Sequence, residues 1–207
     1  MKKTVVLCLP TYVMVPFKYL LGMMNLLLYK QDEYVIKGVL TLDRLYIDYN
    51  RNVIARDAIK NYDPDYLFWV DGDMVLECDT IERLMRHDKD IVSGVYFKKE
   101  SFEPVMFSKQ GNLYTPVLKW PSAGIFKVDA VGMGCCLIKA EVFRKVPPPW
   151  FKYEVESNKG EDIYFCEKVR AAGFDIWVDP EVTPRHLGTS DVGIEHFRAK
   201  FGREDLP

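Results

Sequence analysis

The sequence predicts an α/β fold, with a mostly parallel central sheet that helices cover on both faces. The first observation is the order of residues 4–9, 17–30 and 34–40, which read as strand, helix and strand. This order is typical of a parallel sheet with crossover helices. The second observation is an apolar run at 66–70, Tyr-Leu-Phe-Trp-Val, which follows Asp63-Pro64 and is rich in aromatic residues. Strands that are apolar throughout belong to sheets covered on both faces.

Composition narrows the class of protein. The 207 residues carry 48% hydrophobic residues and no obvious linker, so we expect one domain spanning 1–207. A net charge of -2 argues against a nucleic-acid partner. The five cysteines are odd in number and include no CxxC pair, which favours reduced thiols over disulfides or a zinc site. Residues 12–29 are too short and too polar for a membrane span, so we expect a soluble, cytoplasmic protein.

The first half of the chain, residues 1–97, is predicted to form the nucleotide-binding half. After the strand at 4–9, apolar residues recur at helical spacing within 17–30: Leu20, Met23, Met24, Leu27 and Leu28. A polar loop is expected at 43–50, followed by a helix at 51–59. The strand at 66–70 leads to a helix at 80–87, which Asp79 or Thr80 is expected to cap. A further strand is predicted at 91–96.

The second half, about 98–190, begins with a different sequence pattern. Residues 98–129 hold prolines and aromatics without helical periodicity, so we expect a small mixed or antiparallel extension there. A strand at 135–138, a helix at 140–145 and a stiff connector at 147–151 follow. A helix is expected from Gly160 to about 172, where Gly173 ends it. A last strand is predicted at 176–180, and the tail (191–207) contains an amphipathic stretch at 191–200.

Two carboxylates follow the buried strand at 66–70. Asp71 and Asp73 are separated only by Gly72, and in an extended chain their side chains would lie on the same side. Open α/β sheets bind ligands just beyond the carboxyl ends of their strands. Two hard oxygen ligands with a glycine that permits close approach suit a divalent cation carrying a phosphate. An ordinary acidic turn is the alternative, because Asp-Gly is also a common turn sequence.

Three more polar features come later in the chain. Gly132 and Gly134 form a glycine turn before a strand, Glu161 and Asp162 open a helix, and His186 follows the last strand. Each has an ordinary structural explanation. Glycines serve any tight turn, acids in a first turn stabilise the helix dipole by ~0.3–1 kcal/mol each, and an isolated histidine is usually a surface or capping residue.

Taken in order, these features resemble the motifs of GT-A-fold nucleotide-sugar glycosyltransferases, especially the large inverting family 2. The resemblance runs from residue 5 to about 188. In detail the chain is similar to the short glycosyltransferase domains encoded by large DNA viruses of algae. The matching segments are Asp71-Gly-Asp73 for the DxD motif, Gly132-Met-Gly134 for the glycine loop, Gly160-Glu-Asp162 for the xED motif, and His186 for the late histidine.

The resemblance implies a metal site made by Asp73, His186 and Asp71, in which Asp71 either binds directly or reaches the ribose or the metal through water. A divalent cation would offset the negative charge that develops on the departing diphosphate. Oxygen ligands with one imidazole nitrogen favour Mn²⁺, with Mg²⁺ as the alternative. His87 and His196 lie in charged, helical surroundings, and we expect no metal there.

Asp162 is the candidate general base. An acceptor hydroxyl must lose its proton as it attacks the anomeric carbon, and a nearby carboxylate can accept it. Glu161 would orient the acceptor or brace the loop. The UDP-sugar donor (UDP-glucose or a relative) is expected to contact residues of the first half: Pro10, Thr11, Tyr12, Asp43, Arg51, Asn52, Arg56, Asp71 and Gly72. Gly132 and Gly134 would let the backbone approach the sugar or the acceptor. Trp120, Trp150 and Phe151 are candidates for sugar stacking, although core packing is their usual role.

The sequence therefore predicts a metal-dependent inverting transferase that moves a hexose or deoxyhexose from a UDP-sugar to a hydroxyl of a glycan acceptor. One alternative is a sugar-nucleotide nucleotidyltransferase, but residues 10–16 lack the glycine-rich, basic loop those enzymes usually carry. A non-catalytic nucleotide-sugar or glycan-binding module is another, although both acid pairs are intact. A retaining transferase would share the metal site, and the stereochemistry of the product separates the two mechanisms.

Overall fold

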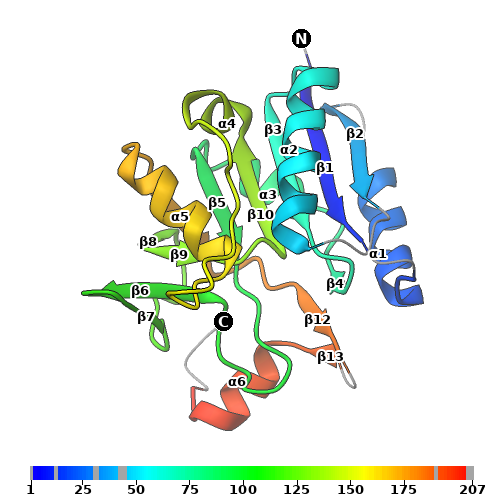
Figure 1. The fold of residues 1–207 in the computed structure, drawn as a ribbon. Coiled ribbons are helices and arrows are strands. Elements are labelled where there is room, and N and C mark those ends of the chain that lie inside the picture. Colours follow the sequence, from blue (N-terminus) through cyan, green and yellow to red (C-terminus); the bar gives the residue numbers. More distant parts are fainter. Residues whose placement is uncertain (1, 12–13, 30–32, 42–45, 189–190, 204–207) are drawn as a thin grey trace.

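The computed structural model describes residues 2–11, 14–29, 33–41, 46–188 and 191–203. Within them, a central sheet of seven strands has the order β2-β1-β3-β10-β5-β11-β8 (Figure 1). These strands are β1 (Lys3–Pro10), β2 (Tyr34–Thr41), β3 (Tyr66–Val70), β5 (Ile91–Gly94), β8 (Phe126–Val128), β10 (Cys135–Lys139) and β11 (Ile176–Asp179).

The sheet is mostly parallel, with one strand inserted against the trend. β1 pairs in parallel with both β2 and β3, and β5 pairs in parallel with β11. β10 runs antiparallel between β3 and β5, and β8 runs antiparallel along β11. The reversed strand brings the glycine turn before β10 to the edge where β3 ends, because antiparallel neighbours begin where their partners finish.

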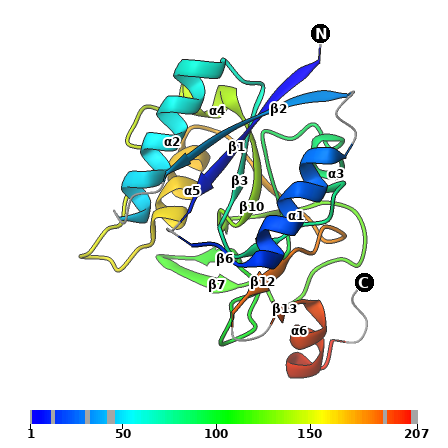
Figure 2. The same ribbon diagram turned by 90° about the vertical axis from the view of Figure 1, so that its right-hand side faces the viewer.

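Helices cover both faces of this sheet, as Figure 2 shows with α2, α4 and α5 on one side and α1 and α3 on the other. The helices are α1 (Phe17–Leu28), α2 (Ile47–Tyr62), α3 (Thr80–Met85), α4 (Ala140–Lys145), α5 (Glu161–Ala171) and α6 (Ile194–Phe201). All five residues of β3 are buried. Leu67 and Trp69 join one core cluster and Phe68 and Val70 join the other, because strand side chains alternate between faces. The predicted fold class is confirmed.

Two small sheets extend the domain. One has the order β7-β6-β9 and is antiparallel: β6 (Met106–Gln110), β7 (Leu113–Pro116) and β9 (Ala130–Val131). It lies where a small antiparallel extension was predicted. The other has the order β13-β12-β4: β4 (Met74–Val75), β12 (Arg185–Leu187) and β13 (Asp191–Val192). This second sheet joins the segment after the central strand to the C-terminal part of the chain, a pairing that local sequence patterns do not reveal.

Several predicted details were wrong. Helix α2 begins at Ile47, inside the expected polar loop, and Asp48 lies in its first turn, where an acid favours the helix dipole. Helix α1 buries Tyr19, Met23 and Leu26, whereas most of the predicted apolar face is exposed: Leu20, Met24, Leu27 and Leu28. Asp79 precedes α3 without a side-chain capping bond, and the Thr80 hydroxyl donates to the carbonyl of Glu77.

The thiols agree with expectation, since all five cysteines are free and four of them are buried. Burial raises the pKa of the Cys135 and Cys166 thiols to about 12, so these side chains are protonated at neutral pH. Among the described residues, no helix has the length and apolar character needed to cross a membrane.

Candidate active site

A cavity of about 370 Å³ opens beside the carboxyl ends of β1 and β3. It brings together residues from every part of the chain: Pro10, Met14, Val15, Pro16, Ile47, Arg51, Asp71, Gly72, Asp73, Glu161, Asp162 and His186. Both acid pairs singled out in the sequence therefore face one space, together with the late histidine. The position agrees with the general rule for ligand sites in open α/β sheets.

Backbone pairing places Asp73 beside His186. β4, which follows Asp73 directly, pairs with β12, and the N–H of Leu187 donates to the carbonyl of Asp73 at 2.7 Å. The His186 Nε2 atom then lies 3.4 Å from Oδ2 of Asp73. Residues 71–73 form a turn, with the N–H of Met74 donating to the Asp71 carbonyl, so the expected extended geometry is wrong. Asp71 and Asp73 consequently have different partners, although both line the cavity.

The ring of His186 has a fixed orientation. Its Nδ1 lies 2.8 Å from the carbonyl oxygen of Phe97, which can only accept, so Nδ1 carries a hydrogen. Nε2 therefore faces the carboxylate of Asp73: the protonated ring donates a hydrogen bond to it, whereas the neutral ring has on Nε2 the lone pair that a metal ion needs. A backbone carbonyl holding the second ring nitrogen is the usual support of a metal-binding histidine. The edge of the Tyr96 ring packs against the imidazole with centroids 5.9 Å apart.

Lys99 also contacts Asp73, and no sequence motif predicts this contact. Its Nζ lies 2.6 Å from the same Oδ2 atom. Burial acts to raise the pKa of Asp73, but hydrogen bonds from His186 and Lys99 outweigh it and lower the pKa to about 2. Asp73 is therefore ionised across the physiological range.

These residues fit a divalent cation that also takes ligands from a substrate. Within the described part of the chain, no group of three or more His, Cys, Asp or Glu side chains is placed to hold a metal ion. Asp73 and His186 offer two donors, one oxygen and one nitrogen, facing each other across 3.4 Å. Cations with few protein ligands complete their coordination with water and substrate phosphates. The arrangement suits a cation that binds together with a diphosphate.

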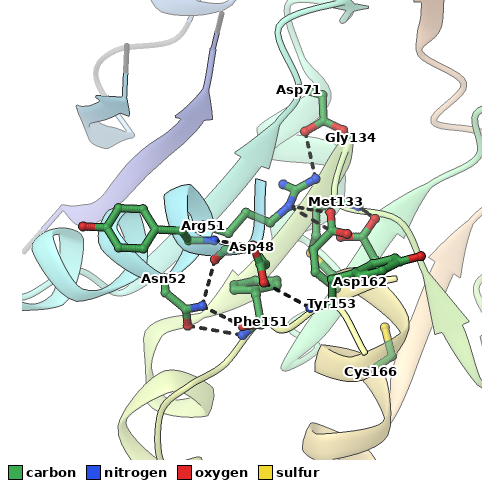
Figure 3. Close-up of polar contacts among 12 residues, drawn as sticks. Asp48, Arg51, Asn52, Asp71, Met133, Gly134, Phe151, Tyr153, Asp162 and Cys166 are labelled. Atoms are coloured by element: carbon green, nitrogen blue, oxygen red, sulfur yellow. Dashed lines mark hydrogen bonds and ion pairs between the residues drawn. The ribbon is translucent and has the colours of Figure 1, made fainter. Parts of the chain in front are cut away.

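A buried arginine organises the other acids (Figure 3). The guanidinium of Arg51 lies 3.1 Å from Asp71, 3.3 Å from Glu161 and 3.5 Å from Asp162. The guanidinium lies against a pair of packed rings, with its carbon Cζ 5.8 Å from the centroid of Trp69 and 5.9 Å from that of Phe151. Three carboxylates share one cation, so this cluster carries an excess of negative charge.

Asp162 sits at the N-terminus of α5, against the glycine turn. Its Oδ2 accepts the N–H of Met133 at 3.3 Å, whereas Oδ1 has no hydrogen-bond partner among the described residues. Burial raises the pKa of Asp162 to about 8, against the lowering effect of Arg51 and with further raising effects from Glu161 and Asp71. A carboxylate with a raised pKa and one oxygen that makes no hydrogen bond, although Arg51 lies 3.5 Å from it, is equipped to accept a proton near neutral pH.

Two other predicted nucleotide contacts have different surroundings. Asn52 donates to the carbonyl of Phe151 at 2.6 Å and accepts the N–H of Trp150 at 2.8 Å, so its amide holds the proline-rich connector against α2. Arg56 is exposed and pairs with its neighbour Asp57 at 2.9 Å. Neither residue lines the cavity. Tyr12 and Asp43 lie outside the described residues. Pro10 and Gly72 line the cavity. Thr11 does not, but in the sequence it stands between Pro10 and Met14, which both line the cavity.

The glycine turn packs against Tyr96. A Cβ added to Gly132 would lie 2.2 Å from the Tyr96 hydroxyl oxygen, and one added to Gly134 would lie 2.9 Å from its ring carbon Cζ. The N–H of Gly134 donates to that hydroxyl at 3.0 Å. Both glycines are buried, so their smallness serves the packing of Tyr96, and the intervening Met133 N–H is the group that reaches Asp162.

The remaining candidates lie away from the cavity. His87 Nε2 is 2.8 Å from the buried Asp179, and His196 Nδ1 accepts the N–H of Gly193. Trp120, Trp150 and Phe151 are buried in the larger core cluster. Lys99 and Tyr96 were missed in the sequence because each is a single residue whose partners lie in distant segments; no local motif marks them.

Solved structures share this fold. A197 from STIV is 21% identical, with a TM-score of 0.64 over 91% of this chain and 86% of that chain. GalNAc-T7, crystallised with UDP, GalNAc and Mn²⁺, is 11% identical, with a TM-score of 0.53 over 87% of this chain and 42% of that chain. The sequence matches no protein-family model and no curated protein. At these identities the likeness establishes the fold, which is a GT-A-like α/β domain.

Proposed function

We propose that this protein is a metal-dependent inverting glycosyltransferase, which moves a hexose or deoxyhexose from a UDP-sugar to a hydroxyl of a glycan acceptor. The proposal rests on one observation above all. Asp71, Asp73, Glu161, Asp162 and His186 come from three distant segments and line one cavity. The fold adds support, because GalNAc-T7, which was crystallised with UDP, GalNAc and Mn²⁺, has it too.

Asp73 and His186 would hold the cation, with Mn²⁺ favoured over Mg²⁺ because an imidazole nitrogen is one of the ligands. When bound, the cation supplies Lewis-acid stabilisation of the leaving diphosphate. The fixed Nδ1–H bond to the carbonyl of Phe97 orients the ring so that Nε2 faces Asp73, and this fixes the position of the nitrogen ligand.

Asp162 would act as the general base. Its Oδ1 atom is buried without a hydrogen bond, and the Met133 N–H holds the other oxygen. An acceptor hydroxyl donating to Oδ1 would satisfy that atom and would be oriented for attack. As the new glycosidic bond forms and the bond to the diphosphate breaks, the proton of the hydroxyl passes to Oδ1.

Arg51 would act as a positioning residue for both halves of the site. It joins Asp71 of the nucleotide side to Glu161 and Asp162 of the acceptor side through one guanidinium. Its Nη1 has no hydrogen-bond partner among the described residues, so one donor remains for a ligand. Direct contact with ribose or diphosphate, expected from the sequence, therefore stays a prediction.

A panel of nucleotide sugars with Mn²⁺ tests the proposal, scored by thermal stabilisation and by slow hydrolysis of the donor. UDP-sugars should stabilise the protein more than GDP-sugars, because a site that pairs with the uracil imide leaves polar groups unsatisfied with guanine, at ~1–3 kcal/mol per group. TDP-sugars are the closer competitor. Equal stabilisation by GDP-sugars would reject a uridine site, and an α/β mixture or retained configuration in the product would reject inversion.

A further inference from the structure

Lys99 occupies a position that the proposed transferase needs for its cation. Its Nζ is 2.6 Å from Oδ2 of Asp73, the same oxygen that faces Nε2 of His186 at 3.4 Å. A divalent ion held by Asp73 and His186 would take that oxygen and that nitrogen as ligands. The ammonium and the metal would then be close neighbours of like charge on one carboxylate oxygen.

The side chain of Lys99 is held in this position by packing over Gly188. A Cβ at Gly188 would lie 3.2 Å from Cδ and 3.4 Å from Cγ of Lys99, tighter than ordinary contact. The glycine therefore leaves room for the lysine stem where the chain leaves β12. Lys98, its neighbour, differs: its ammonium pairs with Glu103 at 3.1 Å and does not contact Asp73.

We propose that Lys99 is a resident counter-ion of Asp73, which holds the cation position while the donor is absent and leaves it when a divalent ion binds. The proposal rests on the function proposed above. It follows from geometry: the Lys99 ammonium contacts the partly buried Asp73 carboxylate at the same oxygen that faces His186. An incoming diphosphate brings oxygen ligands for the metal and negative charge for the released ammonium. Metal and nucleotide should therefore bind cooperatively, with the metal alone binding weakly.

The test measures Mn²⁺ binding by the electron paramagnetic resonance signal of free Mn²⁺, with and without UDP. Lys99→Met keeps the stem and removes the charge. Without UDP it should bind Mn²⁺ about tenfold or more tightly than the wild type, the size of effect that one neighbouring charge has on the proton affinity of a carboxylate. The gain in Mn²⁺ affinity on adding UDP should shrink. Lys98→Met is the matched control and should behave as the wild type.

A second measurement follows the lysine itself. Acetylation of the wild-type protein, read by mass spectrometry, should modify Lys99 faster when saturating Mn²⁺ is present, and Lys98 at an unchanged rate. Equal or weaker Mn²⁺ binding by Lys99→Met, or a Lys99 acetylation rate that Mn²⁺ leaves unchanged, overturns the proposal.

Failure of the proposed function has a different signature. If UDP binding depends on Mn²⁺ in the wild type and this dependence is lost in Asp73→Asn, the metal site stands and the Lys99 comparison alone decides. If UDP binds equally with and without Mn²⁺ in every variant, the metal-dependent function is rejected, and the role of Lys99 with it.

Discussion

Removing the guanidinium of Arg51 should destabilise the fold more than any surface change of the same size. The side chain is 2% exposed and pairs with Asp71, Glu161 and Asp162. Arg51→Met keeps most of the volume, so the packing against neighbouring rings is largely retained. The change leaves three partly buried carboxylates without their shared cation, and breaking a buried ion pair from one side costs ~3–5 kcal/mol. For a protein of this length, that is a fall in Tm of roughly 6–20 °C.

The loss of folding stability in Arg51→Met should depend on pH in a defined direction. In the folded protein the pKa of Asp162 lies above its ordinary value, mainly because of burial, so ionising Asp162 costs stability as the pH rises towards about 8. Arg51 opposes that shift, and without it the pKa rises further. Below about pH 8 both proteins lose this stability in parallel, because Asp162 stays protonated in both folded states; above it the wild type levels off while Arg51→Met continues to lose stability. The stability difference between wild type and Arg51→Met should therefore be larger at about pH 9.5 than at about pH 7.

Denaturant titrations at the two pH values measure this, followed by intrinsic tryptophan fluorescence. Arg56→Met is the matched control, because Arg56 lies on the same helix, is exposed and pairs only with Asp57. An exposed pair of this kind is worth ~0–1 kcal/mol. A loss below ~1 kcal/mol in Arg51→Met, or a loss equal at both pH values, would refute the view of Arg51 as the buried counter-ion of the acids.

Four further outcomes are expected. Asp162→Asn should slow turnover by ~10² or more while UDP affinity, measured by calorimetry, changes only a few fold; full activity would remove this residue from the chemistry. In the wild type, kcat/KM should rise with pH and level off above about 8, since the base works when ionised. UDP binding should require Mn²⁺, Asp73→Ala should abolish that requirement, and His87→Ala should retain it; calorimetry in EDTA decides. Gly132→Ala should cost ~1–3 kcal/mol by overpacking against a tyrosine, whereas Gly160→Ala, with open space around it, should cost little in a thermal melt.

Local sequence patterns were sufficient to predict the secondary structure of segments that are regular and buried. The apolar run at Tyr66–Val70 could be predicted as a central strand because it has no charged residue, whereas a strand with one side facing solvent would alternate apolar and polar residues. The helix after Gly160 begins where two acids follow a glycine. Helix α2 begins four residues before the predicted start, because Asp48 and Asn50 look like loop residues, and it ends three residues later than predicted. In the structure the Asp48 carboxylate accepts the N–H of Tyr153, a contact 105 residues away.

The parts of the site that could not be predicted depend on long-range contacts. Arg51 was predicted to contact the donor, with a solvated helix face as the alternative, but its burial was not predicted, since nothing beside it in sequence is acidic or aromatic in a telling pattern. Its burial follows from Trp69 and Phe151, which lie in a strand and a connector far from it in the chain. The meeting of Asp73 with His186 likewise depends on the pairing of two very short strands, β4 and β12. Strands of two and three residues carry too few side chains for any period to be detected.

The two aspartates of the Asp71-Gly-Asp73 segment divide their work because the turn between them sends them to different cations. Asp71 is paired with Arg51, a buried counter-ion that it shares with Glu161 and Asp162. Asp73 is paired with Lys99, whose side chain is 30% exposed, and the proposal above makes this counter-ion exchangeable. In a site that binds and releases a charged donor, as proposed, the two carboxylates would have different roles. Asp71 would keep the acid cluster together between turnovers, and Asp73 would change partner during each one.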